Sequence, residues 1–309
     1  MPFRFSVNSW AASSQHEWSE RARRIEASGY TTLFMPDHLA DTLSPFAALA
    51  TAAQAAPRLR VGPYVLNNDL RHPVVVAHEI ATLDLLTDGR VDLGLGAGYA
   101  DSEYRSAGLR FDRGATRVAR LAETVEILKG LLSGEAVTFH GAHYHVAGHQ
   151  LHPRPVQSPR PPILIGGNGH ELLALAAREA DIVSLTGATF RSRGRAPVLS
   201  GFGSLGLSER IGWIRAAAKG RSVPPALNIL VQHVVIADTQ RKAAEQVVTR
   251  FASVTADAAL ESPFLLLGPI DQIVETLRER RERWGLANVT IFDRSIDEFA
   301  PVVARLAGT

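Results

Sequence analysis

Two kinds of segment alternate along nearly the whole chain of 309 residues. Short apolar stretches rich in β-branched residues are followed by longer stretches whose apolar residues recur every three or four positions, which is the spacing of an amphipathic helix. In residues 17–27, for example, Trp18, Ala22 and Ile25 share one helical face. The predicted strands are 3–8, 31–35, 59–66, 91–95, 162–166, 181–185, 227–236 and 288–292.

The segments between these strands predict helices over 17–27, 73–86, 116–132, 171–178, 208–218, 239–251 and 270–284. A repeated strand-then-helix pattern predicts an α/β fold whose parallel strands are joined by right-handed crossovers. An open, doubly wound sheet alternates in the same way but usually has fewer strands. Eight predicted strands in a chain of this length therefore favour a closed (β/α)8 barrel, the TIM barrel, and we expect residues 1–309 to form a single domain of this kind.

Two segments interrupt the alternation. Residues 133–162 carry no helical pattern, and 137–145 predict a small hairpin that turns at Gly141. Residues 186–206, after the sixth predicted strand, are rich in glycine, serine and arginine. Loops of this length in compact domains are usually functional or disordered. We therefore expect this long insertion to form a lid over the active site.

Composition argues against several classes of protein. The 33 basic residues nearly balance the 31 acidic ones, and arginines lie beside glutamates along predicted helices, which is typical of solvated helix faces. A nucleic-acid-binding protein would concentrate its positive charge, so we expect no nucleic-acid partner.

No apolar run approaches the ~18 residues of a membrane span, and no secretion signal is visible. We expect a cytoplasmic protein that binds no membrane. The chain has no cysteine, which excludes disulfides and cysteine nucleophiles.

Residues that follow the strands are the candidates for chemistry, because active sites of these barrels lie at the carboxyl ends of the strands. The second predicted strand is followed by Asp37 and His38. A histidine titrates near neutral pH and can act as a general acid or base. A histidine at this kind of position is also often structural, as are Arg71 and His72 after the third strand, which we expect to serve packing and capping.

Two further strand exits are rich in glycine. The fourth strand ends in Gly96-Ala97-Gly98-Tyr99, where backbone N–H groups can approach a phosphate or a flat ring, although a tight strand exit explains these glycines equally well. It is not the dinucleotide fingerprint, because Tyr99 stands where the third glycine should fall and a long loop follows before the next predicted helix. The fifth strand ends in Gly166-Gly167-Asn168-Gly169-His170 and leads into a helix, which predicts an anion site. Together the exits could hold opposite sides of one phosphate-bearing cofactor.

Histidines are frequent in the predicted hairpin region, at positions 140, 143, 145, 149 and 152. Their spacing permits a metal site, but the segment lacks the carboxylate or thiolate ligands expected of one. We therefore interpret them as surface histidines and expect no bound metal.

Taken together, the strand exits resemble those of the luciferase-like monooxygenase superfamily, and within it the branch that uses the deazaflavin coenzyme F420. The similar stretches are 29–38, 59–73, 81–98, 165–167, 180–181 and 280–285. The run from 71 to 98 is the most specific, and the similarity covers nearly the whole chain except 186–206. The resemblance thus implies a bacterial-luciferase-like barrel.

The resemblance also implies roles for individual residues. His38 is expected to be the proton donor or acceptor beside the reacting ring, and Asp37 to contact the cofactor. A non-prolyl cis peptide bond is expected between Tyr64 and Val65, where it would back the ring. Tyr99 replaces a glutamate acid of some deazaflavin dehydrogenases, so their sugar chemistry is not carried over, although Tyr99 remains a candidate proton donor. The further cofactor-binding candidates are Asn67, Gly96, Ala97, Gly98, Ser102, Gly166, Gly167, Asn168, Gly169 and His170.

The expected reaction is hydride transfer between the deazaflavin carbon C5 and a small organic substrate, with His38 moving the accompanying proton. The candidate substrate contacts are Asn8, Trp10, Phe190 and Arg193. One alternative keeps the fold but uses reduced FMN and oxygen, as a monooxygenase. Another is a barrel that binds flavin without turnover. The resemblance also implies a homodimer formed through the helices that follow the second and third strands.

Overall fold

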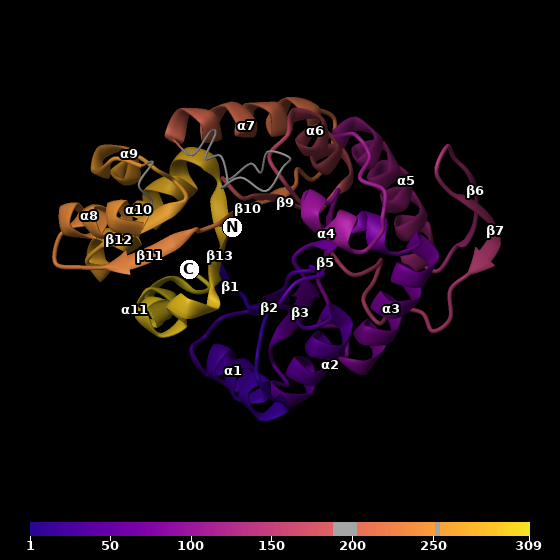
Figure 1. The fold of residues 1–309 in the computed structure, drawn as a ribbon, viewed down its shortest axis with the longest axis horizontal. Coiled ribbons are helices and arrows are strands. Elements are labelled where there is room, and N and C mark those ends of the chain that lie inside the picture. Colours follow the sequence, from indigo (N-terminus) through magenta and orange to yellow (C-terminus); the bar gives the residue numbers. More distant parts are fainter. Residues whose placement is uncertain (188–202, 251–253) are drawn as a thin grey trace.

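The computed structural model describes residues 1–187, 203–250 and 254–309. Its main sheet is entirely parallel and curves around a central axis (Figure 1). In spatial order its strands are β3 (Arg60–Pro63), β2 (Thr32–Met35), β1 (Arg4–Asn8), β13 (Leu286–Phe292), β10 (Ala226–Leu230), β9 (Ile182–Leu185), β8 (Ile163–Gly166), β5 (Leu93–Gly96) and β4 (Leu66–Asn67).

The two ends of this sheet meet. β3 and β4 are consecutive pieces of one stretch of chain, β4 pairs with β5, and a parallel bridge joins Val61 in β3 to Val91 just before β5. The nine strands therefore occupy eight positions around a barrel, which confirms the predicted (β/α)8 fold.

Helices surround the barrel (Figure 1). They are α1 (Gln15–Ala27), α2 (Pro45–Ala55), α3 (Pro73–Leu86), α5 (Gly114–Leu132), α6 (His170–Glu179), α7 (Ser204–Ala217), α10 (Ile270–Trp284) and α11 (Ile296–Leu306). The bounds of α3 and α10 are those predicted. α3 starts with a proline at its first position, where a missing N–H costs nothing, and α10 ends at Gly285 in the left-handed conformation. The sequence analysis missed α2 and α11.

Side chains along β1 point alternately outward to the surrounding helices and inward to the barrel interior. Phe5 and Val7 point outward and are fully buried against the helices, where the ring of Phe5 meets Phe299 of α11 edge-on at 5.5 Å. Ser6 and Asn8 therefore face the barrel interior, because successive side chains of a strand point to opposite sides.

Within the barrel, the side chain of Val65 packs against glycines of the neighbouring strands. The peptide bond between Tyr64 and Val65 is cis, as the resemblance implied, and it separates β3 from β4. A Cβ atom on Gly96 would lie 2.5 Å from Val65 Cγ2, and Cβ atoms on Gly94 and Gly166 would lie 3.2 Å from its Cγ1. Glycine is thus needed at 96 to make room for Val65, and at 94 chiefly because a Cβ there would lie 2.2 Å from the backbone oxygen of Pro63.

A polar network crosses the same interior. The hydroxyl of Tyr64 shares a hydrogen bond with Ser184, and the amide of Asn228 donates to both hydroxyls, while Thr290 donates to the Asn228 oxygen. We call Tyr64, Ser184, Asn228 and Thr290 the interior network. All four residues are buried and mutually hydrogen-bonded.

The predicted strand 227–236 is wrong as a single element. β10 ends at Leu230, and β11 (His233–Ile236) pairs instead with β12 (Leu265–Gly268) in a separate sheet. The change happens within two residues, since the N–H of Val231 still donates to Thr290 of the barrel and that of Gln232 donates to Phe264. An apolar run buried in both sheets gives no sign of such a change.

The small sheet belongs to a side module that also contains α8 (Gln240–Arg250) and α9 (Ala256–Leu260). In Figure 1 this module and the β6–β7 hairpin lie on opposite sides of the barrel. The hairpin, β6 (Ala136–His140) and β7 (His145–Gln150), is antiparallel and confirms the predicted one. Its turn is held by the Glu123 carboxylate, which accepts N–H groups of three successive residues, 142–144.

The predicted long loop 186–206 ends earlier than expected. α7 begins at Ser204, so the last three residues of that range are helical. Residues 188–202 lie outside the described part of the chain, and with them the expected lid and the candidate substrate contacts Phe190 and Arg193. Within the described ranges, no helix has the length and apolar character needed to cross a membrane.

Candidate active site

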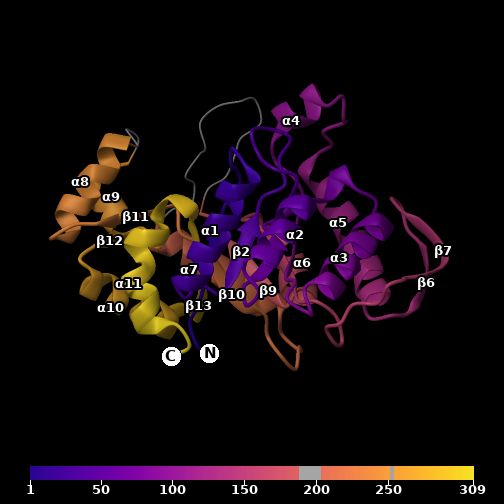
Figure 2. The same ribbon diagram turned by 90° about the horizontal axis from the view of Figure 1, so that it is seen from below.

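The strand exits named above gather at one end of the barrel. Figure 2 shows α4 (Asp101–Ser106) at the end opposite to the two chain termini. α4 follows β5 and lies near the exit of β2, where Glu103 reaches His38.

His38 is held through both of its ring nitrogens. Nδ1 lies 2.8 Å from the Glu103 carboxylate, whose other oxygen accepts the N–H of Leu39 at 2.9 Å. Nε2 lies 3.2 Å from the hydroxyl of Tyr99, and the two rings meet edge-on. We call Glu103, His38 and Tyr99 the rim cluster. It brings together an imidazole from the exit of β2 with a phenol and a carboxylate that lie four positions apart after β5.

The phenol of Tyr99 stays protonated over a wide pH range. Although 45% of this residue is exposed, its hydroxyl lies inside the rim cluster. Desolvation there, with the nearby Glu103 carboxylate, raises the pKa of Tyr99 to about 12. At neutral pH Tyr99 is therefore a neutral group that carries a proton.

Asp37 is placed differently from its neighbour. It is 5% exposed, and its carboxylate accepts two hydrogen bonds from the guanidinium of Arg71 and one from the backbone N–H of Asn67. This bidentate, charge-assisted pair is a strong form of ion pair. Asp37 thus ties the end of β2 to the end of β4 and fixes the backbone from which His38 projects. Arg71, expected to serve packing, is the partner in this tie.

The fourth strand exit is packed against the same region. Gly98 has a φ of +72°, and a Cβ atom there would lie 2.1 Å from the hydroxyl of Tyr104. Tyr104 in turn donates to Asn67 and Asp69. Packing within the protein therefore accounts for the glycine at 98, as it does for the one at 96. Ser102 is exposed on α4.

The fifth exit leaves a helix end accessible. Gly169 precedes α6 without a side-chain hydrogen bond to the helix, and a Cβ atom there would meet nothing within 4 Å. Asn168 is held by its side chain against Thr186, and His170 packs edge-on against Trp213 at 4.9 Å. The start of α6 is thus exposed and has no side-chain cap, as at anion sites on helix ends, with Glu171 as the opposing charge in the first turn.

Among the described residues, two buried polar atoms at the strand exits have no hydrogen-bond partner. They are Oδ1 of Asn8, at the end of β1, and Nδ2 of Asn68, just after β4. Each residue is 5% exposed. A buried polar group without a partner is costly, so these atoms fit a site completed by a ligand that offers one donor and one acceptor.

An aromatic wall stands on the β1 and β13 side of this end. Trp10 meets Phe292 edge-on at 5.6 Å, and the guanidinium of Arg294 lies 4.7 Å from the ring of Phe292. This wall suits a substrate with apolar or aromatic surface. Of the candidate substrate contacts, Asn8 and Trp10 both lie here.

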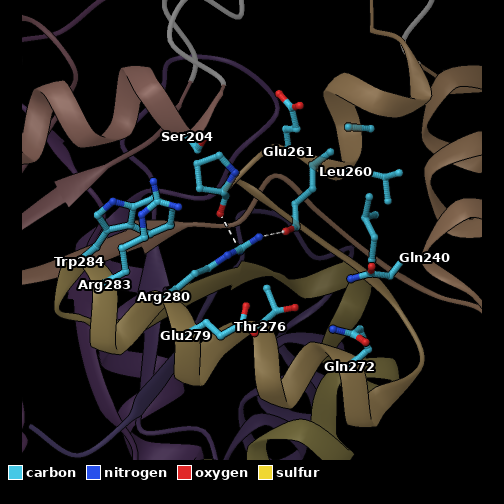
Figure 3. Close-up of a pocket in the computed structure, with 14 residues that line it drawn as sticks. Ser204, Gln240, Leu260, Glu261, Gln272, Thr276, Glu279, Arg280, Arg283 and Trp284 are labelled. Carbon is cyan, nitrogen blue, oxygen red and sulfur yellow. Dashed lines mark hydrogen bonds between the residues drawn. The ribbon is translucent and has the colours of Figure 1, made fainter.

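A cavity of about 380 Å³ lies along α10, between that helix and the side module (Figure 3). Arg280 enters it and donates to the backbone oxygens of Ser262, Pro263 and Leu265, so it caps the loop after α9. Burial lowers the pKa of Arg280 to about 10, which leaves it charged at neutral pH. None of the strand-exit candidates lines this cavity.

The sequence analysis did not identify Glu103. An acidic residue in the short segment after Tyr99 is typical of a solvated turn, and 65 positions separate Glu103 from His38. The only signal was its place just after the fourth strand exit, which in a barrel adjoins the others.

Among the described residues, no group of three potential metal ligands occurs, and the rings of His140 and His145 lie 5.7 Å apart across the hairpin.

Comparison with known proteins gives a family match over most of the chain. The family described as luciferase-like monooxygenase matches residues 1–284. A curated relative, the F420-dependent glucose-6-phosphate dehydrogenase of Microbacterium testaceum, is 35% identical over 164 residues, which are 50% of this chain and 48% of the relative. The alignment thus spans about half the length of that relative.

Two solved structures illustrate the range of proteins with this fold. The coenzyme F420-dependent tetrahydromethanopterin reductase from Methanopyrus kandleri aligns with a TM-score of 0.77 at 18% identity, covering 99% of this chain and 100% of that one. The oxygenating component of 3,6-diketocamphane monooxygenase from Pseudomonas putida, solved with FMN, aligns with a TM-score of 0.72 at 17% identity, covering 99% and 96%. At these identities the likeness concerns the fold alone.

Proposed function

This chain belongs to the luciferase-like monooxygenase family, and from that premise we propose that it is an oxidoreductase that transfers a hydride between coenzyme F420 and a small organic substrate. The proposal rests chiefly on one observation, the position of His38 between Glu103 and Tyr99 at the carboxyl ends of the strands. The F420-dependent relative with 35% identity supports the choice of coenzyme.

The residues at this end fit a flat, phosphate-bearing coenzyme. The accessible N–H groups at the start of α6, next to Gly169, suit a phosphate. The unpartnered atoms of Asn8 and Asn68 suit the polar edge of a heterocycle. Val65, after the cis peptide bond, is half-buried and would support the ring from below. The remaining contacts we propose are the backbone of 96–98 and 166–168, with Asn67, Ser102 and His170.

When bound, a reduced deazaflavin supplies a hydride and reacts poorly with oxygen, so reduction of a C=C, C=N or C=O bond is the favoured chemistry. The protein's own part is to move a proton. His38 supplies or accepts it, and a positioned acid or base of this kind contributes about 10²- to 10⁴-fold to a rate. Asp37 holds the peptide backbone before His38 through Arg71. Asn8 and Trp10 would bound the substrate beside the aromatic wall.

Titration of the purified protein with coenzyme F420 and with FMN, in oxidised and reduced forms, tests this proposal. We expect F420 to bind and FMN to bind much more weakly. Tight FMN binding with no F420 binding would favour the alternative, a monooxygenase that uses reduced FMN. Gly169→Val, which places a branched side chain over the first turn of α6, should weaken F420 binding. The matched control is Gly212→Val on the exposed side of α7, where a Cβ also meets no described atom within 4 Å.

We also propose that the protein forms a homodimer through α2 and α3. Three apolar side chains of α3 are exposed, Val75 at 50%, Leu85 at 46% and Leu86 at 71%. Exposed apolar side chains that lie together often mark a protein–protein contact. Sedimentation measurements should therefore give a dimer mass, and Leu86→Glu should shift the equilibrium toward the monomer. A monomeric wild-type protein at micromolar concentration contradicts the proposal.

A further inference from the structure

The rim cluster contains a residue whose part in the proposed proton transfer follows from hydrogen-bond geometry. We propose that Glu103 is a positioning residue that holds His38 in the tautomer with its proton on Nδ1, so that Nε2 faces Tyr99 and Tyr99 ends a proton relay of Glu103, His38 and Tyr99. This inference rests on the proposed function for its purpose, but its geometry concerns residues of this chain alone.

The first step is the role of the carboxylate. An ionised carboxylate only accepts hydrogen bonds, so the nitrogen 2.8 Å from Glu103 must be the one that carries a proton. In a neutral imidazole the other nitrogen is then an acceptor. Nε2 is therefore the basic atom, and the partner placed next to it is the Tyr99 hydroxyl, at 3.2 Å.

The second step is the orientation of Glu103 itself. Its second oxygen accepts the backbone N–H of Leu39, next to His38 in the chain. The carboxylate is thus fixed at both oxygens, and its side chain is only 16% exposed. Because the carboxylate binds both the ring of His38 and the adjacent backbone, it fixes the plane of the imidazole as well as its tautomer.

The third step is the path of the proton. Both ring nitrogens of His38 are engaged by protein groups, so a proton that leaves Nε2 passes first to the Tyr99 hydroxyl, 3.2 Å away. During reduction, the substrate takes the hydroxyl proton of Tyr99, and the tyrosine oxygen takes the Nε2 proton of a protonated His38. One proton moves at each site and no electron crosses the relay, since the hydride comes separately from the deazaflavin.

The charges around His38 come from few elements. Asp37 precedes it and is neutralised by Arg71, Glu103 contacts it from α4, and Tyr99 from the exit of β5. Among these described neighbours, Glu103 is thus the carboxylate that balances a protonated His38 directly.

The test is nitrogen NMR of the imidazole of His38 in the protein without coenzyme, at a pH where the ring is neutral. We expect the proton on Nδ1 in the wild type. In Glu103→Gln, the amide oxygen must accept the N–H of Leu39, so the amide NH₂ faces Nδ1. The proton should then move to Nε2, which reverses the pattern of the two nitrogen signals.

Two further variants complete the test. Tyr99→Phe should keep the proton on Nδ1 and shift only the Nε2 signal, because that nitrogen loses its donor. Asp101→Asn, on the same short helix but paired with Arg105, should leave both signals unchanged. A wild-type proton on Nε2, or an unchanged pattern in Glu103→Gln, overturns the inference. Because no coenzyme is present, these results are independent of whether F420 binds.

Discussion

The interior network and the rim cluster are both polar groups of an otherwise apolar barrel, and they differ in the chemistry of their members. The interior network consists of hydroxyls and one amide, all buried and satisfied by one another. The rim cluster consists of a carboxylate, an imidazole and a phenol, with His38 26% exposed at its side chain. The interior network contains no carboxylate or imidazole, whereas the rim cluster joins a phenol to one of each.

This difference separates two uses of hydrogen bonds. A fully satisfied buried network helps to specify one packing arrangement of the barrel, because any disturbance leaves a polar group unpaired. A partly exposed cluster of titratable groups stabilises the fold little but can pass protons to a ligand. We therefore expect substitutions in the interior to change mainly stability, and substitutions at the rim to change mainly activity.

The largest expected effect comes from His38→Ala. Loss of the proton donor should lower turnover by about 10²- to 10⁴-fold, the range for a general acid or base, with little change in the free energy of unfolding. Oxidation of reduced F420 by a substrate that the wild type turns over, followed by absorbance, measures it. His16→Ala on the exposed face of α1 is the control. Unchanged turnover in His38→Ala contradicts the role given to this histidine.

The next effect should come from Asn228→Leu in the interior network. The side chain keeps its approximate size but no longer bonds Tyr64, Ser184 and Thr290, which should cost about 2–4 kcal/mol of unfolding free energy. Urea denaturation measures the loss. Asn288→Leu, which removes one long hydrogen bond of 3.3 Å to Leu227, should cost less. Equal losses of unfolding free energy in the two variants would contradict the stabilising role given to the interior network.

A smaller effect should appear at high pH. Burial raises the pKa of Tyr64 to about 12, from an ordinary value of 10.0. The folded protein then holds this proton more tightly than the unfolded chain does. The stability that Tyr64 contributes is therefore complete below pH 10 and is lost as the pH rises toward 12, by roughly 2–3 kcal/mol.

Denaturation at several pH values compares the two regions. Tyr64→Phe should flatten the fall in stability between pH 10 and 12. Tyr99→Phe should flatten it less, because Tyr99, whose pKa is also raised to about 12, is 45% exposed and solvent screens its surroundings. Parallel curves for wild type and Tyr64→Phe would show that this phenol does not titrate in that range.

Local patterns predicted the barrel and much of its periphery. The helix 270–284 has strong periodicity and is followed by Gly285, and the helix 73–86 begins with a proline; the bounds of both are confirmed. The cis bond at Tyr64 was implied by the family resemblance, and no local pattern predicts it. The departure of the chain from the barrel at Gln232 could not be predicted, because both sheets bury the same kind of residue.

The candidate site divides in a similar way. His38 and Tyr99 follow strands directly, and barrel geometry brings strand exits together, so both could be identified as candidates. Glu103 and Arg71 could not be assigned partners, since their contacts depend on how α4 and the turn after β4 fold back. The side chain of Tyr64, a candidate for cofactor binding, lies in the interior network, and no local sequence pattern indicated those partners.

A crystal structure of the protein soaked with coenzyme F420 tests the central claim most directly, since that claim concerns where the heterocycle lies relative to His38. We predict a phosphate at the first turn of α6 and the ring within contact distance of the Tyr99 hydroxyl. Coenzyme found elsewhere, for example in the cavity along α10, or an imidazole of His38 turned away from the bound ring, would contradict it.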